Sequence, residues 1–530
     1  MKTSTYAIIN LSDVTAIDDA IYNTNSLFDY CNLDCIKKEN YSTKKYATCE
    51  LNTFLLDGSF EEMDELDENN FSYWSGSLSK GDGTFDITPT IISNFSFNHS
   101  SAGLTVNYDS NYPLPKEVTF TFYDSQDNVI NSIVDYPTDY NHTLDIPAEN
   151  YRKLTIEFNE VNPYSRARIK NIVYGIQLLY SSESNKNLSK ASVLEEVDIT
   201  SKEIAVNTST LTVIDKDNYF SITNPRGVYK FLQKRQKIGI YEHIEGEEDD
   251  YVMAMHYLKS WSTKTGAIST FKCMDIIGCM DDTTFPDHIY ENKTAGYIID
   301  EIMDDFGFSD YYVDPDIRSI VLNGAIEECS HREALQQVAF ACCATVDTSR
   351  ITGINIYKAS LATQSTISKS RIFMSPERTI TQDDLVTKVV VYNHSYVLDE
   401  KGEIVDEDGK TYSSKETEEQ LDYVNVKEVK NASLVDTNNS KKVANYLYDY
   451  YQYRLNHSFK LIVQNEKAGN MCAVQLNDSM VPVLITSMDI DLTGGFVAKI
   501  KGIGNSFVIP NEYYAREDNF ELYANDMGVI

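Results

Sequence analysis

Hydrophobic and polar residues alternate along the first third of the chain in a pattern that is typical of β-strands. Between residues 46 and 180, short alternating runs such as EVTFTFYD and YRKLTIEFN are separated by turns rich in Asp, Asn, Gly and Pro. This pattern predicts a β-sandwich over 46–180, preceded by a mixed, polar lead-in over 1–45. The stretch SSESNKNLSK, residues 181–190, has the composition of a linker and predicts a domain boundary.

Two further β-rich units follow, over 191–290 and 376–508. The first contains the runs KEIAVNTSTLTVID and AISTFKCMDIIG, and the second contains DLVTKVVVYNHSYV and a hairpin with the turn TGG. The second unit also holds the predicted helix NSKKVANYLYDYYQYRL. Both units run in the order strands, a helix or short helix, a strand and a hairpin. This shared order predicts an internal repeat, although no residue identity is detectable between the two units.

A small helical unit is predicted between them, over 291–375, and a tail follows them over 509–530. Apolar residues at positions 295, 298, 299, 302, 303 and 306 share one helical face, and Gly307 stands where a C-terminal cap belongs. The second helix lies in CSHREALQQVAFACCATVD, where Ser330 and Glu333 form the pattern of a capping box. The fold class predicted is therefore multidomain and mainly β, with a β-sandwich and two β-rich units flanking a small helical α/β unit.

That second helix also raises a question of chemistry, since it holds a histidine, a glutamate and three cysteines. At the ordinary rise of a helix, His331 and Cys342 lie about 16 Å apart along the axis, too far for a Cys–His pair. Cys342 shares its face with Leu335, Val338 and Ala339, and free cysteine on such a face usually behaves as a small hydrophobe. We therefore expect Cys342 to be buried, without a metal or disulfide contact.

Charge and composition narrow the function further. Asp and Glu outnumber Lys and Arg by 80 to 46, which gives a formal charge of −34. Such a charge disfavours binding to nucleic acid or to an anionic membrane, but it would suit a channel through which DNA slides without sticking. The N-terminus lacks the apolar core of a signal peptide, no apolar run is long enough for a membrane helix, and the nine cysteines show no CxxC spacing.

Signatures of catalysis are weak. Pairs of carboxylates could suggest a glycosidase, but they occur by chance in so acidic a chain. The sequence DEDG at 406–409 resembles part of a calcium loop, yet it lacks the ligand spacing, and a hairpin turn is preferred. The sequence contains no GxSxG, HExxH or P-loop motif, and its eight histidines are dispersed. We expect no enzymatic activity and no catalytic, cofactor-binding or metal-binding residue.

Aromatic residues of the predicted sandwich are the remaining candidates for a binding site. Trp74, Tyr73 and His99 could offer stacking surfaces to the sugar rings of a glycan. The alternative is that they pack in the core or at the rim of the sandwich.

Several segments resemble the tail hub proteins of phages, also called tail-associated or baseplate hub proteins. The stretch from VLEEVDITSKEIAV to KIGIYE resembles their first tube-like domain, and KTAGYIIDEIMDDFGF and SHREALQQVAFACCATVD resemble the paired helices of their middle domain. NSKKVANYLYDYYQYR followed by SMDIDLTGGFVAKIKGIG is similar to their second tube-like domain. Residues 46–180 look like the discoidin-like sandwich, a possible carbohydrate-binding domain, that is often fused to such hubs.

This resemblance implies a structural virion protein that connects the tail tube to the tail tip or baseplate and lines the DNA passage. It implies a homotrimer whose two tube-like β-barrel domains per chain match a hexameric tube. The implied partners are the tail tube or distal tail protein, the tape-measure protein and other baseplate proteins, and host cell-wall glycan is a possible ligand. The protein would be assembled in the bacterial host cytoplasm, without a membrane anchor. A glycan-adhesion protein of the tail tip is the alternative, and a cell-wall hydrolase is less favoured because no peptidase or muramidase pattern is present.

Overall fold

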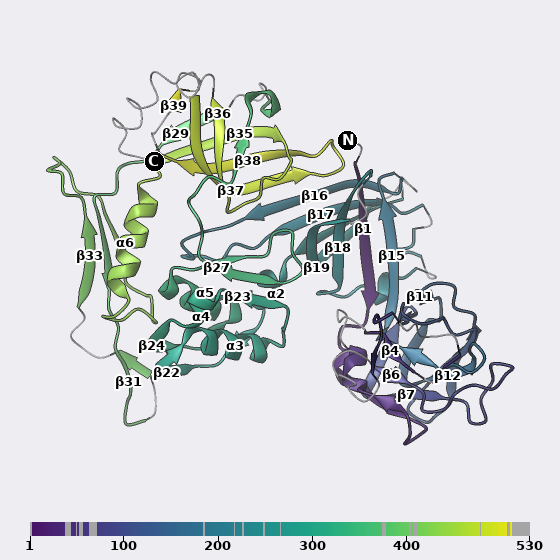
Figure 1. The fold of residues 1–530 in the computed structure, drawn as a ribbon. Coiled ribbons are helices and arrows are strands. Elements are labelled where there is room, and N and C mark those ends of the chain that lie inside the picture. Colours follow the sequence, from purple (N-terminus) through teal and green to yellow (C-terminus); the bar gives the residue numbers. More distant parts are fainter. Residues whose placement is uncertain are drawn as a thin grey trace. The chain divides into compact units, whose positions relative to one another are not determined.

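The structure, a computed structural model, shows a multidomain and mainly β chain, which confirms the predicted fold class (Figure 1). It describes residues 3–37, 44–48, 50–51, 57–62, 72–183, 186–216, 218–224, 227–246, 250–264, 267–373, 378–401, 404–406, 411–476, 479–505 and 509–510. The chain forms two compact units and passes between them several times. Unit 1 holds residues 1–7, 180–214 and 239–530, and unit 2 holds residues 8–179 and 215–238.

The core of unit 2 lies between two sheets. The larger sheet runs in the order β10-β9-β12-β7-β2, with the strands β2 (Ile21–Thr24), β7 (Thr90–Ser101), β9 (Glu117–Tyr123), β10 (Val129–Asp135) and β12 (Ala148–Glu160). The smaller sheet consists of β8 (Leu104–Asn107), β11 (Asn141–Leu144) and β14 (Asn171–Val173). Inward residues such as Phe120, Ile156 and Val106 meet in one core. Such a two-layer core is what alternating strands predict, and β2 adds residues from the segment predicted as a lead-in.

The other elements around unit 2 are short or cross a unit boundary. They are α1 (Ala16–Asp19), β3 (Tyr30–Cys31), the 3-10 turn η1 (Leu33–Lys37), β4 (Tyr46–Ala47), β5 (Glu61–Glu62), β6 (Tyr73–Trp74), β13 (Arg168–Ile169) and η3 (Tyr229–Phe231). The strands β1 (Thr3–Ser12) and β15 (Gly175–Ser181) each run through a point where the chain changes unit.

The large sheet of unit 1 contains the same arrangement of five strands twice. The first group is β16 (Leu188–Glu196), β17 (Thr208–Ile214), β18 (Lys237–Ile244), β19 (Tyr251–Lys264) and β20 (Ile268–Met274). The second is β29 (Thr379–Gln382), β35 (Leu455–Ile462), β36 (Met471–Leu476), β37 (Ser479–Asp491) and β38 (Val497–Gly504). Across the sheet the first group runs β18-β19-β20-β17-β16 and the second runs β36-β37-β38-β35-β29. If the five strands of each group are numbered in chain order, both groups have the order 3-4-5-2-1 across the sheet. The predicted repeat therefore exists as a repeat of topology.

The two groups also share an irregularity. The pairing of β19 with β20 shifts between Leu258 and Ser260, and the pairing of β37 with β38 shifts between Ile485 and Ser487. A shift of this kind is a β-bulge, which re-aims the strand and is a fixed feature of a fold. The bulges therefore give a common reference from which residues of the two groups can be matched.

A helical region lies between the groups. Its elements are α2 (Ile276–Met280), β21 (Thr284–Phe285), β22 (His288–Thr294), α3 (Ala295–Phe306), β23 (Tyr311–Val313), α4 (Pro315–Arg318), β24 (Val321–Ile326), β25 (Cys329–Ser330), α5 (His331–Cys342), β26 (Thr345–Asp347), β27 (Ile354–Tyr357), β28 (Ser365–Ile367) and η4 (Lys369–Arg371). The helices α3 and α5 are the two that the sequence predicted. As predicted, α3 ends at Gly307 in the left-handed conformation, and α5 begins with the Ser330–Glu333 capping box.

An inserted module follows β29. It consists of β30 (Lys388–Tyr392), β31 (Tyr396–Leu398), β32 (Ile404–Asp406), β33 (Tyr412–Glu416), β34 (Val426–Val429) and α6 (Ser440–Tyr451), and the short strand β39 (Ile509–Pro510) ends the described chain. The helix α6 packs on β30 and β33. The strands β31 and β32 form a hairpin. The predicted DEDG turn begins at Asp406, and its other residues, 407–409, lie outside the described part of the chain.

Candidate functional site

The two strand groups are joined into one sheet by hydrogen bonding between β16 and β37, which lie side by side (Figure 1). The pairing is antiparallel and extends from Ser192 opposite Asp491 to Glu196 opposite Ser487. It uses only the part of β37 that follows the bulge, because the part before it pairs with β36. The joint brings together segments that lie about three hundred residues apart in the sequence, and it makes one continuous wall from both groups.

A buried ion pair supports the joint on the core side of the sheet. Glu195 of β16 is fully buried, and its Oε1 accepts a hydrogen bond from Nε of Arg350 at 2.6 Å. Arg350 lies in the turn after β26 and is 17% exposed. A buried charge pair is costly to break from one side, because the remaining charge is left unpaired in the interior. The helical region is thereby tied to the strand that carries the joint.

A second ion pair links the same region to the second strand group. Asp347, at the end of β26, is buried, and its Oδ2 lies 2.6 Å from Nζ of Lys467. Lys467 precedes β36 in the chain. The turn between Asp347 and Arg350 therefore holds one charged partner from each strand group, and it fixes both groups against the same helical region.

A buried carboxyl completes this support. Asp275 caps the N-terminus of α2 by accepting from the amide of Gly278 at 3.0 Å, and it also accepts from the hydroxyl of Thr348 at 2.6 Å. Burial raises the pKa of the Asp275 carboxyl to about 6, although its hydrogen bonds act in the opposite direction. The charge of Arg332 also acts to lower this pKa, but burial outweighs it, so the neutral form of the carboxyl is favoured.

The opposite face of the joined sheet is open and rich in hydroxyl groups and lysines. Cross-strand register places eleven hydroxyl side chains on it: Ser192, Thr208, Thr210, Thr212, Ser260, Ser262, Thr270, Thr379, Thr381, Ser458 and Ser487. Six lysines share that face, namely Lys190, Lys264, Lys272, Lys460, Lys499 and Lys501, against three acids, namely Glu196, Asp489 and Asp491. The excess of acids over bases in the whole chain is thus reversed on this face.

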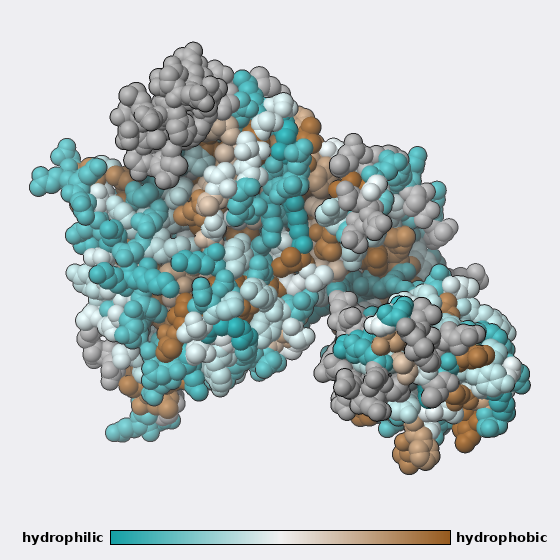
Figure 2. Space-filling model, viewed as in Figure 1, coloured by the Kyte–Doolittle hydropathy of each residue, from teal (hydrophilic) through white to brown (hydrophobic). Residues whose placement is uncertain are grey.

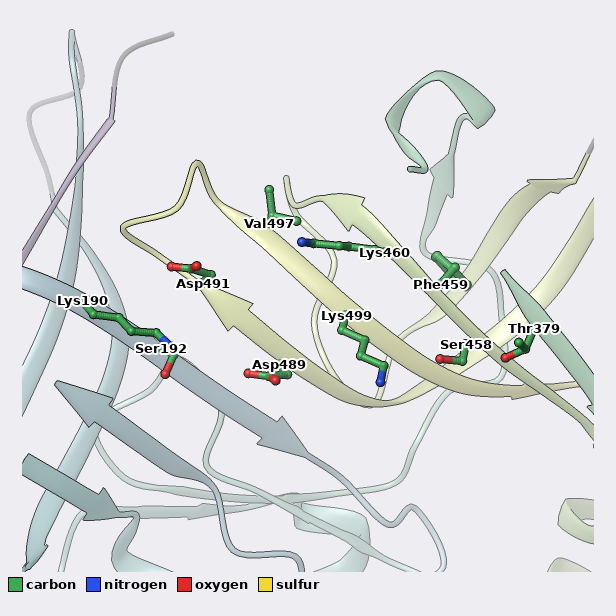
Figure 3. A pocket seen from close by; sticks show the side chains of 10 residues that line it. All are labelled: Lys190, Ser192, Thr379, Ser458, Phe459, Lys460, Asp489, Asp491, Val497 and Lys499. Carbon is green, nitrogen blue, oxygen red and sulfur yellow. The ribbon is translucent and has the colours of Figure 1, made fainter. Parts of the chain in front are cut away.

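A hollow of about 590 Å³ lies on the open face where the two groups meet (Figure 3). Lys190 and Ser192 reach it from β16, Asp489 and Asp491 from β37, and Lys499 from β38. Within the described residues, no ion pair shorter than 4 Å involves any of the six lysines of this face. Hydrophilic residues also cover most of the view of unit 1 in Figure 2, where hydrophobic ones form small separate patches. Lysines therefore outnumber acids on this face, in contrast to the chain as a whole.

Trp74 and Tyr73, the first two predicted glycan-binding residues, are buried in unit 2, at 1% and 0% exposure. The Trp74 ring packs against Tyr46 and Tyr112, and the Arg168 guanidinium lies 4.4 Å from its centroid. Arg168 in turn forms an ion pair with the buried Glu50. A ring enclosed in this way cannot stack on a sugar, so the position of both residues matches the alternative of packing in the core.

His99, the third predicted residue, lies between two carboxylates. Its Nδ1 is 3.0 Å from Oδ2 of Asp13 and its Nε2 is 2.9 Å from Oδ2 of Asp19, and the ring is 5% exposed. Burial acts to raise the pKa of Asp19, but hydrogen bonds from His99 and from backbone amides lower it to about 2. Both ring nitrogens are occupied inside the protein, and His99 holds α1 against β7. The structure does not place His99 in the cluster formed by Tyr46, Trp74 and Tyr112.

The sulfur-rich helix α5 packs as a structural element. Leu335, Val338, Ala339 and Cys342 are all buried in the core of the helical region, and burial raises the pKa of the Cys342 thiol to about 12. His331, at the other end of the helix, contacts Asp305 at 2.9 Å. Among the residues that the structure describes, no group of three or more His, Cys, Asp or Glu side chains could hold a metal ion. In the same residues, no helix is long and apolar enough to cross a membrane.

Sequence reasoning did not identify the residues of the joint or of the open face. A local signal was present, because the alternation in LSKASVLEE places Lys190 and Ser192 on one side of a strand, and VAKIKGIG does so for Lys499 and Lys501. What the alternation does not contain is the order of strands across the sheet. The grouping of these residues therefore emerged only from the fold.

Comparison with solved structures finds similarity to phage tail proteins. A 43 kDa tail protein of prophage MuSo2 from Shewanella oneidensis is 11% identical, with a TM-score of 0.41, and the match covers 59% of this chain and 93% of that one. A tail protein from Neisseria meningitidis MC58 is 10% identical, with coverage of 60% and 92% and a TM-score of 0.41. The prophage tail protein gp18 from Listeria monocytogenes EGD-e is 13% identical, with coverage of 60% and 94% and a TM-score of 0.37. No protein-family model and no curated protein matches the chain. Because these identities are low and the TM-scores lie below 0.5, we draw no functional argument from the similarities.

Proposed function

We propose that this chain is a structural tail hub protein of a phage or phage-like particle, which connects the tail tube to the tail tip or baseplate. The observation that carries the proposal is the repeated strand arrangement, joined into one sheet through β16 and β37. One chain thereby supplies two equivalent segments of a wall. A ring of such chains has twice as many wall segments as chains, so it can match a tube with twice as many subunits around its axis.

The number of copies follows from that match. Three chains with two wall segments each give six segments, which is the symmetry that the resemblance to tail hub proteins implies for the tail tube. The ranges 191–290 and 376–508 are then the two tube-like domains, and 291–375 is the middle domain between them. The ion pairs of Glu195 with Arg350 and of Asp347 with Lys467 support this arrangement, because they fix both wall segments to the middle domain.

The open face is then the wall of the DNA passage. The residues on the other face of these strands, such as Val193, Leu211, Phe271 and Met488, are buried, so the hydroxyl-rich face is the one available to line a lumen. Hydroxyl groups and lysines offer weak, sequence-independent contacts to phosphates, and the described strand residues of this face include no arginine that could make bidentate contacts. Such a wall would guide DNA without holding it.

Residues 46–180 would form an outward domain in this proposal, and its discoidin-like identity and any binding of cell-wall glycan are part of the proposal. Trp74, Tyr73 and His99 give no support to glycan binding because of their burial. We therefore favour a structural role for the protein over glycan adhesion and over hydrolysis of the cell wall. Its place would be the virion tail, after assembly in the host cytoplasm with tube, distal tail and tape-measure proteins.

Mass photometry of the purified full chain tests the proposal, together with cryo-electron microscopy of particles from cells that express the complete tail. The expected result is a three-chain ring of six β-segments between the tube and the tail tip. A stable monomer at micromolar concentration, together with particles in which no such ring contains this chain, would rule out the hub function.

A further inference from the structure

The joint inside one chain defines how two strand groups connect. It uses an edge strand of the first group, β16, and the residues of β37 that follow the bulge, from Ser487 to Asp491. By strand order, the equivalent of β16 in the second group is β29, and the equivalent of β37 in the first group is β19. The chain therefore makes one joint internally, between β16 and β37. It carries a second, equivalent pair of strands, β29 and β19, that are not joined to each other.

The bulges set the residue correspondence for the long strands. Ser260 is the first paired residue after the bulge in β19 and lies opposite Lys272, and Ser487 has the same place in β37 opposite Lys501. Counting onward from these positions, Ser262 corresponds to Asp489 and Lys264 corresponds to Asp491. The end of β19 therefore matches the part of β37 that forms the joint.

The correspondence extends to the edge strands through their neighbours. Lys501 lies opposite Ser458, and Ser458 lies opposite Thr379 of β29. In the first group, Lys272 lies opposite Thr210, and Thr210 lies opposite Ser192 of β16. Thr379 therefore corresponds to Ser192.

Continuing along the edge strands, Ile380 corresponds to Val193, Thr381 to Leu194 and Gln382 to Glu195.

The end of β19 is an open edge within the described chain. β19 has fourteen residues and its hairpin partner β18 has eight, so β18 covers only part of it. All six residues from Lys259 to Lys264 are exposed. Unpaired strand edges present a row of free backbone donors and acceptors and pair readily with another strand.

β29 is the matching open edge. It ends the order of strands across the sheet, and all four of its residues are exposed, so its outer side has no partner strand among the described residues. Ile380 is 45% exposed, whereas its counterpart Val193 is 1% exposed inside the joint. On the other strand, Trp261 is 37% exposed, whereas its counterpart Met488 is fully buried. Apolar side chains that are buried at the internal joint are therefore uncovered at the equivalent open edges.

We propose that β29 of one copy pairs with the end of β19 of a second copy of this chain, antiparallel and in the register of the internal joint. Thr379 then lies opposite Lys264 of the second copy, Thr381 opposite Ser262, and Gln382 opposite Trp261. Repetition of this contact continues the sheet from chain to chain, and the number of copies that closes it, three, rests on the proposed hub function.

The side chains are compatible with this register. On the open face, Thr379 and Thr381 meet a lysine and a serine, so no like charges are opposed. On the core face, Ile380 meets Thr263 and gains cover for its exposed side chain. Lys264 lies at the edge, where lysine commonly prevents unspecific pairing of strands. In the proposed register it lies opposite the uncharged Thr379.

Cysteine cross-linking of the full chain tests the register. Residues directly opposite in an antiparallel pair have Cα atoms about 4.5–5.5 Å apart, which suits a disulfide. The double variant Thr381→Cys with Ser262→Cys is expected to form disulfide-linked chains under mild oxidation, seen on non-reducing gels and ending at three chains.

Two matched variants serve as controls. Leu194→Cys with Asp489→Cys occupies the equivalent positions of the internal joint and is expected to form a disulfide within one chain, detected by mass spectrometry. Thr381→Cys with Thr263→Cys is shifted by one residue, which directs the two side chains to opposite faces, and it is expected to give little cross-linking.

The outcomes separate this contact from the hub function. A trimer by mass photometry that forms no Thr381–Ser262 cross-link, or cross-links equally in the shifted variant, overturns the proposed contact and leaves the hub intact. Cross-linked species that end at a number other than three keep the contact and overturn the hub. A chain that stays monomeric and uncross-linked overturns both.

Discussion

Val193 and Ile380 occupy equivalent positions in the two strand groups, yet Val193 is 1% exposed and Ile380 is 45% exposed. Val193 is covered because Ile490 lies opposite it across the internal joint. Ile380 has the same place on the edge strand β29, where the described chain provides no covering strand. This difference in exposure supports the proposed pairing of β29 with a second copy of the chain.

We expect Ile380→Lys to prevent assembly while leaving the monomer folded. A charge at this position would be buried by the neighbouring copy, and burying an unpaired charge is strongly unfavourable. Mass photometry should show monomers, and circular dichroism should show the same secondary structure as in the wild type. Ile462→Lys is the matched control, since Ile462 is 46% exposed on the neighbouring strand. If both variants assemble normally, β29 is not an interface.

Loss of the ion pair beneath the joint should destabilise unit 1. Arg350→Ala leaves the fully buried Glu195 without a partner, which costs about 3–5 kcal/mol for a buried pair broken from one side. Urea unfolding followed by tryptophan fluorescence and circular dichroism measures this loss. Arg318→Ala breaks the exposed pair with Asp300 and should cost at most about 1 kcal/mol. Equal effects of the two variants would contradict a special role for Glu195 and Arg350.

Asp275 should make the stability of unit 1 fall as the pH rises. Its pKa is raised to about 6 in the folded protein from a reference value of 3.8, so between these values the unfolded chain loses the proton while the folded chain keeps it. Relative to Asp275→Asn, the wild type should lose about 2 kcal/mol of unfolding free energy between pH 4 and pH 6.5. Paired urea titrations of the wild type and Asp275→Asn across this range measure the difference. A constant difference between wild type and Asp275→Asn would mean that the carboxyl titrates normally.

The lysines of the open face should control weak binding to DNA. Fluorescence anisotropy with a short duplex at low salt should detect binding whose dependence on salt reflects the number of phosphates contacted. The triple variant Lys190→Gln, Lys499→Gln and Lys501→Gln should reduce the slope of log affinity against log salt by about 0.9 for each lysine that contacts a phosphate.

Three exposed lysines outside this face provide the control for that experiment. Lys427→Gln, Lys441→Gln and Lys442→Gln make the same change in net charge on β34 and α6 and should leave the slope unchanged. Equal losses in both triple variants would show that only net charge matters. A higher affinity for poly-glutamate than for DNA would identify an acidic protein as the partner instead.

Trp74→Ala should destabilise unit 2 without a separate effect on glycan binding. Truncating a buried tryptophan costs about 3–5 kcal/mol, because the cavity is filled only partly by its neighbours. Differential scanning calorimetry measures the loss, and a cell-wall pull-down of the full chain measures binding. Trp74→Phe keeps most of the packing and should bind as the wild type does. Wild-type binding that Trp74→Phe abolishes, with its stability retained, would restore Trp74 as a ligand contact.

Local features of the fold followed directly from the sequence. The end of α3 at Gly307, the capping box of Ser330 and Glu333, and the burial of Cys342 depend on residues within a few positions of one another. Such features are decided by backbone conformation and by the periodicity of apolar residues, so a linear pattern contains them. The alternation of the strands and the order of elements in the two β-rich units were predictable for the same reason.

The tertiary structure alone decided which strands are neighbours and which face of the sheet is open. The joint of Ser192 with Asp491 closes a loop of about three hundred residues, and its register depends on the packing of the whole core. The same holds for Trp74, which could be a surface ring or a core ring by its local pattern and is buried because Arg168 and Tyr112 enclose it. Alternation assigns a side chain to one of two faces, but only long-range packing determines which face meets solvent and which edge remains unpaired.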